Sequence, residues 1–389
     1  MAGTDSPFHF SSTHTSNMGM LLIVVVGLLF NPGALVMRTR QSSKQQHHLP
    51  LAASPEVPLE QPNPRKRRKG GAAASTKRSA PGATMPPLLD LGKLVRGTLV
   101  KRPSASIRSP YVADVSLQTA KKADGNLVLA HAPALDVGGM CVPGSQVYLS
   151  KRDGGKTSHA IELVRGAPLT NKASDKGVLV GAHPRLGELV AQEVLKRGLL
   201  KDELKLKDGW ELGAVDNNIS MNQQVTLGDS RVDFVLTISN NETTHKVVVE
   251  VKNVVCADYA SGTEPQKGND NHCVVVAPAS GRNKYQRSAL FPWGRLGQKY
   301  DGKAVVSERA IKHIRNLQSL SSDDVTTVVM FIVNRSDCES IRACGERCPV
   351  FRDVLKEAVM SSGVKAVGVR VLWQDDGCCH FDGFVPVVV

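Results

Sequence analysis

The chain has 389 residues, of which 41% are hydrophobic and only 4% are aromatic. This length suits two to three domains, and the composition excludes a chain that is disordered throughout, because its aliphatic runs must be buried. The net charge of +13 is uneven, since residues 1–85 carry 10 Lys and Arg against 3 Asp and Glu. The rest of the chain is mildly basic, which is compatible with a polyanionic partner, but a basic tail for solubility or targeting explains the charge equally well.

The eight cysteines include no C-x-x-C pair. They are too sparse for a small disulfide-stabilised scaffold, so we expect mostly reduced, buried thiols. Cys338, Cys344 and Cys348, with His380 further on, do not have the spacing of a common structural zinc site. The sequence therefore argues against zinc.

An apolar run, MLLIVVVGLLF, occupies residues 20–30. Such a run is short for a membrane span of about 20 residues, although the whole stretch 18–37 reaches that length. It has the length of the apolar part of a signal peptide, but no Lys or Arg precedes it. Residues 1–37 are thus predicted to be a signal-like or anchor-like leader. A membrane tether through residues 18–37 and a later start at Met18 both stay open.

Residues 38–87 are rich in Ser, Gln, Pro, Ala, Lys and Arg, which predicts a disordered basic linker. The linker contains five consecutive cations: Arg65, Lys66, Arg67, Arg68 and Lys69. This run suits nuclear localisation or contacts to nucleic acid, and it equally suits the hydrophilic part of a transit peptide for a plastid-like organelle. The compartment stays open between nucleus, organelle and membrane.

Residues 88–172 contain short alternating apolar runs separated by Gly, Pro and Asp. Strands are predicted at residues 94–101, 111–117, 127–132, 146–150 and 159–164. Five short strands without helical periodicity predict a small OB-like β-barrel, a class that often binds oligonucleotides. The only aromatic residues on these strands are Tyr111 and Tyr148, so base stacking has little support.

Residues 178–389 are predicted to form a mixed α/β domain, which makes the whole fold an α+β arrangement of two domains. Apolar residues at helical spacing predict helices at residues 184–200, 306–320 and 350–361. Strands are predicted at residues 219–227, 231–238, 246–254, 325–333 and 366–373, with a last strand in 384–389. A long polar stretch covers residues 256–304.

Three ionisable residues lie within two of these predicted strands. Asp233 is in RVDFVL, and Glu250 and Lys252 are in VVVEVKNVV. Because side chains alternate between the faces of a strand, Glu250 and Lys252 point the same way. The polar residues 239–244 suit a hairpin turn that brings Asp233 beside Glu250. Burying charged side chains in a Val-rich strand costs free energy unless they are paired, and this cost indicates that the residues have a function.

A carboxylate pair with an adjacent lysine suits metal-dependent hydrolysis of a phosphodiester. Mg²⁺ (or Mn²⁺) prefers oxygen ligands and is commonly held by one or two carboxylates plus a substrate phosphate. The ammonium group of Lys252 would position the attacking water or offset charge in the transition state. Surface strands of many proteins can carry a Glu-x-Lys triplet that has no catalytic role, so the triplet alone does not decide the function.

Three segments together resemble the sugar fermentation stimulation protein A (SfsA) family: residues 231–234, residues 250–253 and SERAIKHIRNL at 307–317. Weaker matches occur at residues 142–144, 291–292 and 384–389. The resemblance covers residues 88–389 in order. It implies an OB-type domain followed by a restriction-endonuclease-like domain of the PD-(D/E)XK type. It also implies DNA as the partner and an association with the regulation of sugar metabolism.

The resemblance implies a role for each residue of the site. Asp233 and Glu250 would be the metal ligands, and Lys252 the catalytic lysine. Glu308 and His313 lie on a family helix that faces the same site and would be catalytic, although His313 is equally explained as an ordinary helix histidine. Two further cations on this helix are weaker candidates for nucleic-acid contacts: Arg309 and Lys312.

This sequence also departs from the family pattern. Residues 134–140 lack the Asn-Thr-Gly stretch of the family barrel, and Gly187 stands where the family has an Asn. Glu188 beside it is either a helix carboxylate of the site or a solvated helix residue. Trp293 replaces a family Asp, an insertion follows up to about residue 305, and residues 258–288 are expanded. These insertions flank the predicted site and would alter substrate access.

The sequence therefore predicts an SfsA-like DNA-binding protein with a Mg²⁺-dependent nuclease site. The alternative is a non-catalytic, nucleic-acid-binding regulator linked to sugar metabolism that keeps the fold but cuts nothing. A third, weaker reading is an organelle or membrane-tethered protein whose partner is not a nucleic acid. The residues do not separate DNA from RNA.

Overall fold

The computed structural model describes residues 85–118, 126–133, 137–169, 175–207, 209–228, 230–240, 242–264, 274–277 and 285–389. Residues from Arg78 onward form one compact unit, to which everything below refers. The predicted leader at residues 1–37 and the cationic run at 65–69 lie outside the described residues. Among those that are described, no helix is long and apolar enough to cross a membrane.

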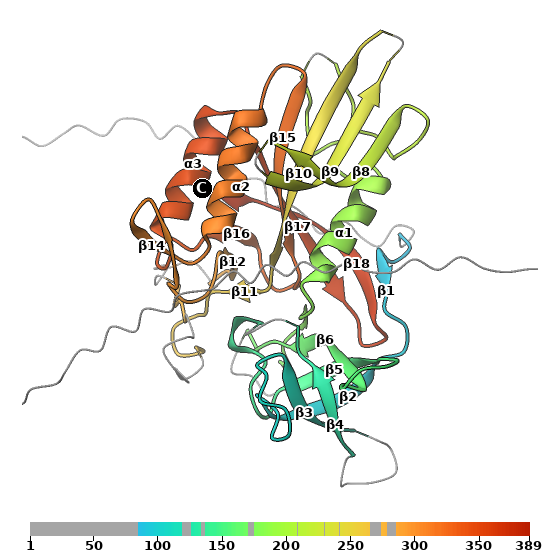
Figure 1. Cartoon of the computed structure of the whole chain (residues 1–389), viewed down its shortest axis with the longest axis vertical. Helices are drawn as coiled ribbons and strands as arrows, with labels where there is room; N and C mark the ends of the chain where they lie inside the picture. Colours follow the sequence, from blue (N-terminus) through green and yellow to red (C-terminus); the bar gives the residue numbers. More distant parts are fainter. Residues whose placement is uncertain are drawn as a thin grey trace, which may run out of the picture. The chain divides into compact units, whose positions relative to one another are not determined.

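The first structural part is the β-barrel (Figure 1). Its strands are β2 (Val95–Lys101), β3 (Val112–Leu117), β4 (Leu127–His131), β5 (Gln146–Lys151) and β6 (His159–Arg165). They pair in the order β4-β3-β2-β5-β6, and a parallel pairing of β4 with β6 closes the barrel. Strand β7 (Leu179–Gly181) extends the sheet beside β6, and a 3₁₀ turn, η1, spans Val137–Gly139. The predicted five-stranded barrel is confirmed.

The second part is built on a seven-stranded sheet with the order β1-β18-β17-β15-β10-β9-β8. Its strands are β1 (Leu89–Asp90), β8 (Ile219–Leu227), β9 (Ser230–Ser239), β10 (Thr244–Val254), β15 (Val325–Val333), β17 (Lys365–Trp373) and β18 (Cys378–Val385). The three middle strands β10, β15 and β17 are parallel. Parallel strands are covered on both faces, which explains why these sequences are nearly continuous runs of Val and Ile.

Helices cover both faces of this sheet (Figure 1). Helix α1 (Arg185–Lys196) packs on one face through Leu186, Val190 and Val194, which join one hydrophobic core. Helices α2 (Glu308–Leu320) and α3 (Pro349–Ser361) pack on the other face and join a second core. The predicted mixed α/β architecture is therefore confirmed.

Some element boundaries differ from the prediction. Helix α1 ends at Lys196 and not at residue 200, because the chain turns at Gly198 with φ of +63°, a conformation that glycine adopts most readily. The chain after residue 373 forms an antiparallel return strand, β18, so the predicted last strand is divided between β18 and β19 (Val387–Val388).

The long polar stretch at about residues 256–304 contains short strands. These are β11 (Cys256–Ala257), β12 (Ser288–Phe291), β13 (Gln298–Tyr300) and β14 (Lys303–Val305). Strands β11 and β12 form a small sheet with β16 (Ser340–Ala343) and β19, whereas β13 and β14 form a separate hairpin. The hairpin turns at Asp301 and Gly302, which both have positive φ, as a tight two-residue turn requires.

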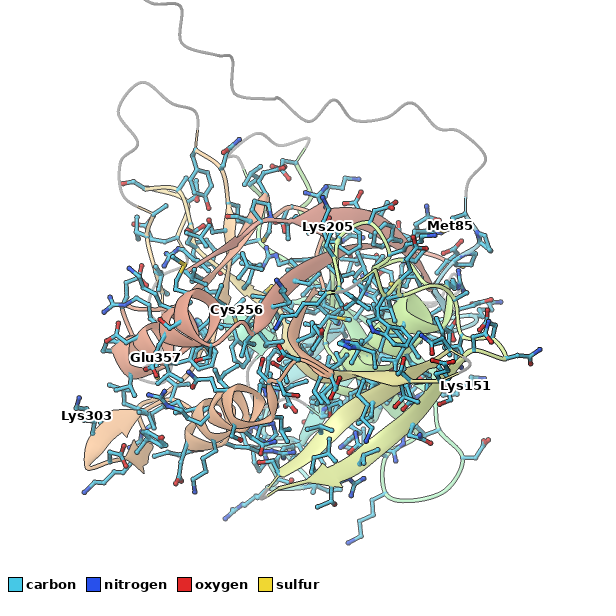
Figure 2. The ribbon with its side chains drawn as sticks, turned by 90° about the horizontal axis from the view of Figure 1, so that it is seen from above. Met85, Lys151, Lys205, Cys256, Lys303 and Glu357 are labelled. Carbon is cyan, nitrogen blue, oxygen red and sulfur yellow. The ribbon has the colours of Figure 1, made fainter. Side chains whose placement is uncertain are left out.

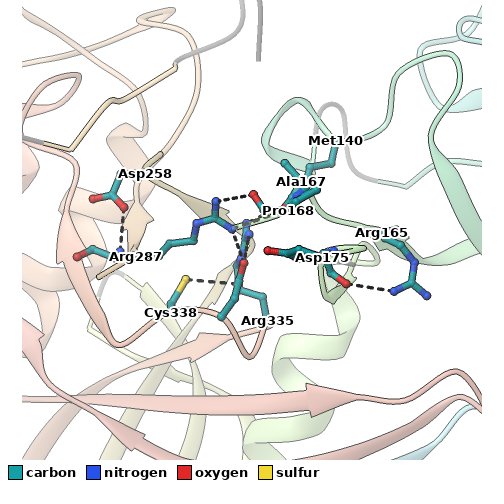
Figure 3. Close-up of polar contacts among 12 residues, drawn as sticks. Met140, Arg165, Ala167, Pro168, Asp175, Asp258, Arg287, Arg335 and Cys338 are labelled. Carbon is teal, nitrogen blue, oxygen red and sulfur yellow. Dashed lines mark hydrogen bonds and ion pairs between the residues drawn. The ribbon is translucent and has the colours of Figure 1, made fainter. Parts of the chain in front are cut away.

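Two buried arginines tie the segment after β6 to the α/β part. Arg335 makes two hydrogen bonds to the carboxylate of Asp337, at 2.6 and 2.8 Å. Arg287 is ion-paired with the same carboxylate and donates to the carbonyl oxygens of Ala167 (3.4 Å) and Pro168 (3.3 Å). Figure 3 shows Arg287 pointing toward these two carbonyls. Both guanidinium groups are ion-paired with Asp337, and Arg287 joins two segments that are distant in the sequence.

Candidate active site

The candidate site begins where the pairing of β9 with β10 stops. The antiparallel ladder runs as far as Phe234 opposite Val249, and Asp233 is the next residue of β9. At this position the carboxylate of Asp233 accepts a hydrogen bond from the backbone N–H of Val251 at 2.7 Å. The hairpin therefore holds Asp233 against the stretch of β10 that carries Glu250, as the sequence predicted.

Glu250 is the centre of a buried group of polar side chains. Lys252, two residues along β10, donates to its Oε1 at 2.6 Å, which confirms that the two side chains share a face. His313 of helix α2 bonds to the same oxygen through Nδ1. Arg309, one turn earlier on α2, donates from Nε to Nε2 of His313 at 3.2 Å. Because Nε2 accepts, the ring proton is assigned to Nδ1, where it faces Glu250.

The two carboxylates have opposite pKa shifts. Burial raises the pKa of Asp233 to about 6, and the negative charge of Glu250 adds to the shift. Burial alone would also raise the pKa of Glu250, but the hydrogen bond with His313 and the charge of Lys252 outweigh it, so this pKa is lowered. Glu250 is thus the stably ionised carboxylate, and Asp233 is held beside it at an electrostatic cost.

Gln224 and Glu188 approach Asp233 from two other elements. Gln224 interrupts β8 with a φ of +56°, which is unusual for a residue other than glycine. Its side-chain amide donates to Asp233 at 3.2 Å and to Glu188 of helix α1 at 3.4 Å. Sequence reasoning did not identify Gln224, because nothing in a polar strand marks one glutamine. It left Glu188 open, and the structure places this carboxylate at the edge of the site.

Gly187 lets helix α1 approach β10 closely. A Cβ atom at this position would lie 2.8 Å from Cβ and 3.0 Å from Oδ1 of Asn253, well inside normal contact. Asn253 in turn accepts a hydrogen bond from Asn334 at 2.7 Å. The glycine that departs from the family pattern therefore faces the residue next to Lys252, and the side chain of Asn253 fills the space that a larger residue would need.

The remaining predicted residues of α2 lie beside this group and line a cavity of about 580 Å³. Glu308 is ion-paired with Lys312 at 2.8 Å, and both side chains are exposed. Arg309 and His313 line the same cavity, so His313 connects it to Glu250. The structure thus brings together Asp233, Glu250, Lys252 and His313, and places Glu308 outside their hydrogen-bonded group.

Within the described residues, no group of three or more His, Cys, Asp and Glu side chains is arranged to hold a metal ion. This absence does not conflict with Mg²⁺, which commonly takes only one or two protein carboxylates and completes its shell with water and phosphate. Asp233 and Glu250 fit that requirement, because a cation between them would relieve the repulsion that raises the pKa of Asp233.

Comparison with known proteins agrees with the resemblance in the sequence. Residues 304–377, which include α2, β15 and α3, match the family model described as "Sugar fermentation stimulation protein RE domain". The chain is related to the SfsA proteins. It is 27% identical over 282 residues to the sugar fermentation stimulation protein homolog of Syntrophotalea carbinolica, covering 71% of this chain and 89% of that protein.

Other SfsA proteins show the same extent of similarity. The homolog of Geobacter sulfurreducens is 28% identical over 283 residues, covering 72% of this chain and 90% of its own length. The SfsA of Pyrococcus furiosus, whose structure is of a complex with Ca²⁺, superposes with a TM-score of 0.53 at 17% identity and covers 78% of this chain and 99% of its own. The shared fold thus extends over both the barrel and the α/β part.

Proposed function

We propose that this SfsA-related chain is a nucleic-acid-binding protein with a Mg²⁺-dependent (or Mn²⁺-dependent) phosphodiesterase site, and that DNA is its substrate. One observation carries the proposal: two carboxylates and a lysine are buried together where β9 and β10 separate, beside a cavity open to solvent. Asp233, Glu250 and Lys252 are 8%, 3% and 8% exposed. Buried ionisable groups with shifted pKa values are concentrated at functional sites.

Each residue has a distinct task in this proposal. Asp233 and Glu250 would hold the metal ion, which supplies Lewis acidity and lowers the pKa of a bound water. Lys252 carries the positive charge that offsets negative charge on the phosphate in the transition state. His313 holds the carboxylate of Glu250 in place through its Nδ1 proton. The Ca²⁺ complex of the Pyrococcus furiosus protein supports a divalent cation in this fold.

A second candidate is a non-catalytic, nucleic-acid-binding regulator, in keeping with the sugar fermentation name of the relatives. The observation in its favour is that Lys252 and His313 both bond to the same oxygen of Glu250. In that arrangement Lys252 neutralises the charge of Glu250 and is not available to contact a phosphate. Such a protein would bind nucleic acid with strong salt dependence and cut nothing.

The deciding experiment is cleavage of single-stranded and duplex DNA and RNA by the full chain in Mg²⁺, Mn²⁺ or EDTA. Glu250→Gln is the test variant, because it keeps the shape of the side chain and removes its charge. We expect metal-dependent cleavage of DNA that falls by about a thousandfold in the variant, as the loss of one preorganised electrostatic contact can cause. Glu339→Gln, an exposed Glu→Gln change on a carboxylate paired with Arg370, is the matched control.

Three results would change the proposal. Equal cleavage by Glu250→Gln and the unaltered chain would mean that the activity comes from elsewhere or from a contaminant. Binding without cleavage under every metal would favour the regulator, with the carboxylates as a retained structural feature. RNA cleavage in place of DNA cleavage would keep the site and change the substrate.

A further inference from the structure

The cavity beside the candidate site is strongly basic. It is lined by Ser230, Arg231, Gln298, Glu308, Arg309, Lys312 and His313, and is called the basic groove below. Three of these residues are permanent cations, whereas Glu308 is the single carboxylate, and it is already paired with Lys312. The groove therefore keeps an excess of positive charge at its surface.

The cations of the groove differ in whether other side chains of the protein already bind them. Arg309 donates to His313, and Lys312 is paired with Glu308. Arg231 is exposed and lies two residues before Asp233 on β9, where its backbone pairs with Thr226 of β8. Its guanidinium makes no hydrogen bond or ion pair among the described residues. An exposed guanidinium without a partner is a ready contact for a phosphate, which it can bind through two parallel hydrogen bonds.

Two backbone amides at the start of helix α2 already have side-chain partners. Its first amide, that of Glu308, already donates to Oε1 of Gln298 at 2.7 Å. The amide of Ala310 donates to the hydroxyl of Ser307 at 3.1 Å, as an N-cap does. The side-chain cations that line the groove are therefore the main contacts available to an anion.

Gln298 forms part of one wall of the groove. It belongs to the β13–β14 hairpin, whose two-residue turn at Asp301 and Gly302 is tight. Figure 2 shows Lys303, at the start of β14, on the outer side of this hairpin. The bond from Glu308 to Gln298 fastens the hairpin to α2, so the inserted segment forms one wall of the groove.

We propose that the basic groove binds the sugar–phosphate backbone of a polynucleotide strand next to the candidate active site, with Arg231 as a principal phosphate contact. The identity of the ligand rests on the proposed function, but the binding itself does not require cleavage. Strands bound here lie against His313, which contacts Glu250, so the groove leads the backbone to the carboxylates.

The test measures the salt dependence of binding in EDTA, where no metal-dependent cleavage occurs. The full chain is used with the linker cations neutralised by Arg65→Gln, Lys66→Gln, Arg67→Gln, Arg68→Gln and Lys69→Gln, so that this run does not mask the groove. Fluorescence anisotropy with labelled oligodeoxythymidine, oligouridine and a DNA duplex is recorded as KCl is raised. Arg231→Gln is compared with the parent chain.

Each phosphate contact contributes about 0.7 to the slope of log affinity against log salt for a single strand, and about 0.9 for duplex DNA. We expect Arg231→Gln to reduce the slope by about this amount and to weaken binding several-fold at low salt. Lys365→Gln, an exposed lysine that lines a separate cavity, is the matched control and should leave the slope unchanged. The three probes show whether DNA or RNA, and single strand or duplex, is preferred.

An unchanged slope in Arg231→Gln, an equal loss in Lys365→Gln, or no binding by the parent chain would each overturn the inference. A reduced slope in a protein that never cleaves would keep the groove and reject the phosphodiesterase. Cleavage that depends on Glu250, together with an unchanged slope, would keep the phosphodiesterase and reject the groove.

Discussion

Two buried groups of charged side chains in the same α/β part are balanced in different ways. Around Asp337, one carboxylate faces two arginines, and every strong charge has a partner. Burial alone would raise the pKa of Asp337, but the charges of Arg335 and Arg287 hold it well below its ordinary value. Around Glu250, two carboxylates share one lysine, and the pKa of Asp233 is raised to about 6.

We interpret the first balance as structural and, in line with the proposed function, the second as functional. In the Asp337 group, each arginine is ion-paired with a carboxylate of the same group, as a buried structural cluster requires. Among the described residues, the group at Asp233 and Glu250 combines two carboxylates with one lysine, so it keeps excess negative charge. Under the proposed function, a bound cation would balance this charge. Three substitutions test this contrast through the stability of the fold and through metal binding.

The largest effect is expected at the paired cluster. Asp337→Asn leaves two buried guanidinium groups without their carboxylate, so the free energy of unfolding should fall by about 3–5 kcal/mol. Chemical denaturation at pH 7 measures it. Because the folded pKa of Asp337 is lowered, this contribution is present above the ordinary carboxyl pKa of about 4 and is lost only as the pH falls further.

The matched control is Glu357→Gln, which breaks an ion pair between Arg315 and Glu357 at 2.7 Å. Both side chains are exposed, with Glu357 labelled in Figure 2, so we expect a change of less than about 1 kcal/mol. A similar small change in Asp337→Asn would show that the buried cluster does not hold the two segments together.

The second effect has the opposite sign. Asp233→Asn removes the carboxylate whose folded pKa is raised above its unfolded value, so the metal-free protein should gain about 2 kcal/mol at pH 7 while it loses metal binding. The sign depends on pH. The unaltered chain becomes less stable as pH rises from about 4 to about 6, where Asp233 ionises, and the variant lacks this trend.

Thermal denaturation in EDTA across this pH range is the measurement, and the same series with Mn²⁺ is its counterpart. Destabilisation by Asp233→Asn in EDTA at pH 7 would contradict the view that the site stores electrostatic repulsion. It would mean that the hydrogen bond from Val251 to Asp233 stabilises the fold by more than the buried charge of Asp233 destabilises it.

The smallest effect is expected from the residue that positions Glu250. His313→Ala removes the hydrogen bond to Glu250 Oε1, and loss of such a supporting contact commonly weakens metal binding by about tenfold or more. Calorimetric titration with Mn²⁺ measures the affinity. The control is His380→Ala on strand β18, which β17 and β15 separate from β10 in the sheet. Equal affinities in the two variants would remove His313 from the site.

The sequence predicted that Asp233, Glu250 and Lys252 lie together, because alternation along a strand is a local property. Glu250 and Lys252 had to share a face, and a polar turn between two apolar strands placed Asp233 next to them. Gln224 could not be found in this way. Its contact depends on an interruption of β8 that no residue pattern announces, and on the approach of α1.

The sequence by itself determined the elements: their apolar periodicity specified a small barrel, two strands carrying the ionisable triplet, and the helices of a mixed α/β fold. Only the tertiary structure decided which distant residues complete the site. His313 lies 63 residues from Glu250 and meets it because α2 packs across the face of the sheet to which Glu250 points. Packing of this kind depends on side chains from the whole core at once, so neither the pairing of His313 with Glu250 nor the basic groove beside it can be read from one segment.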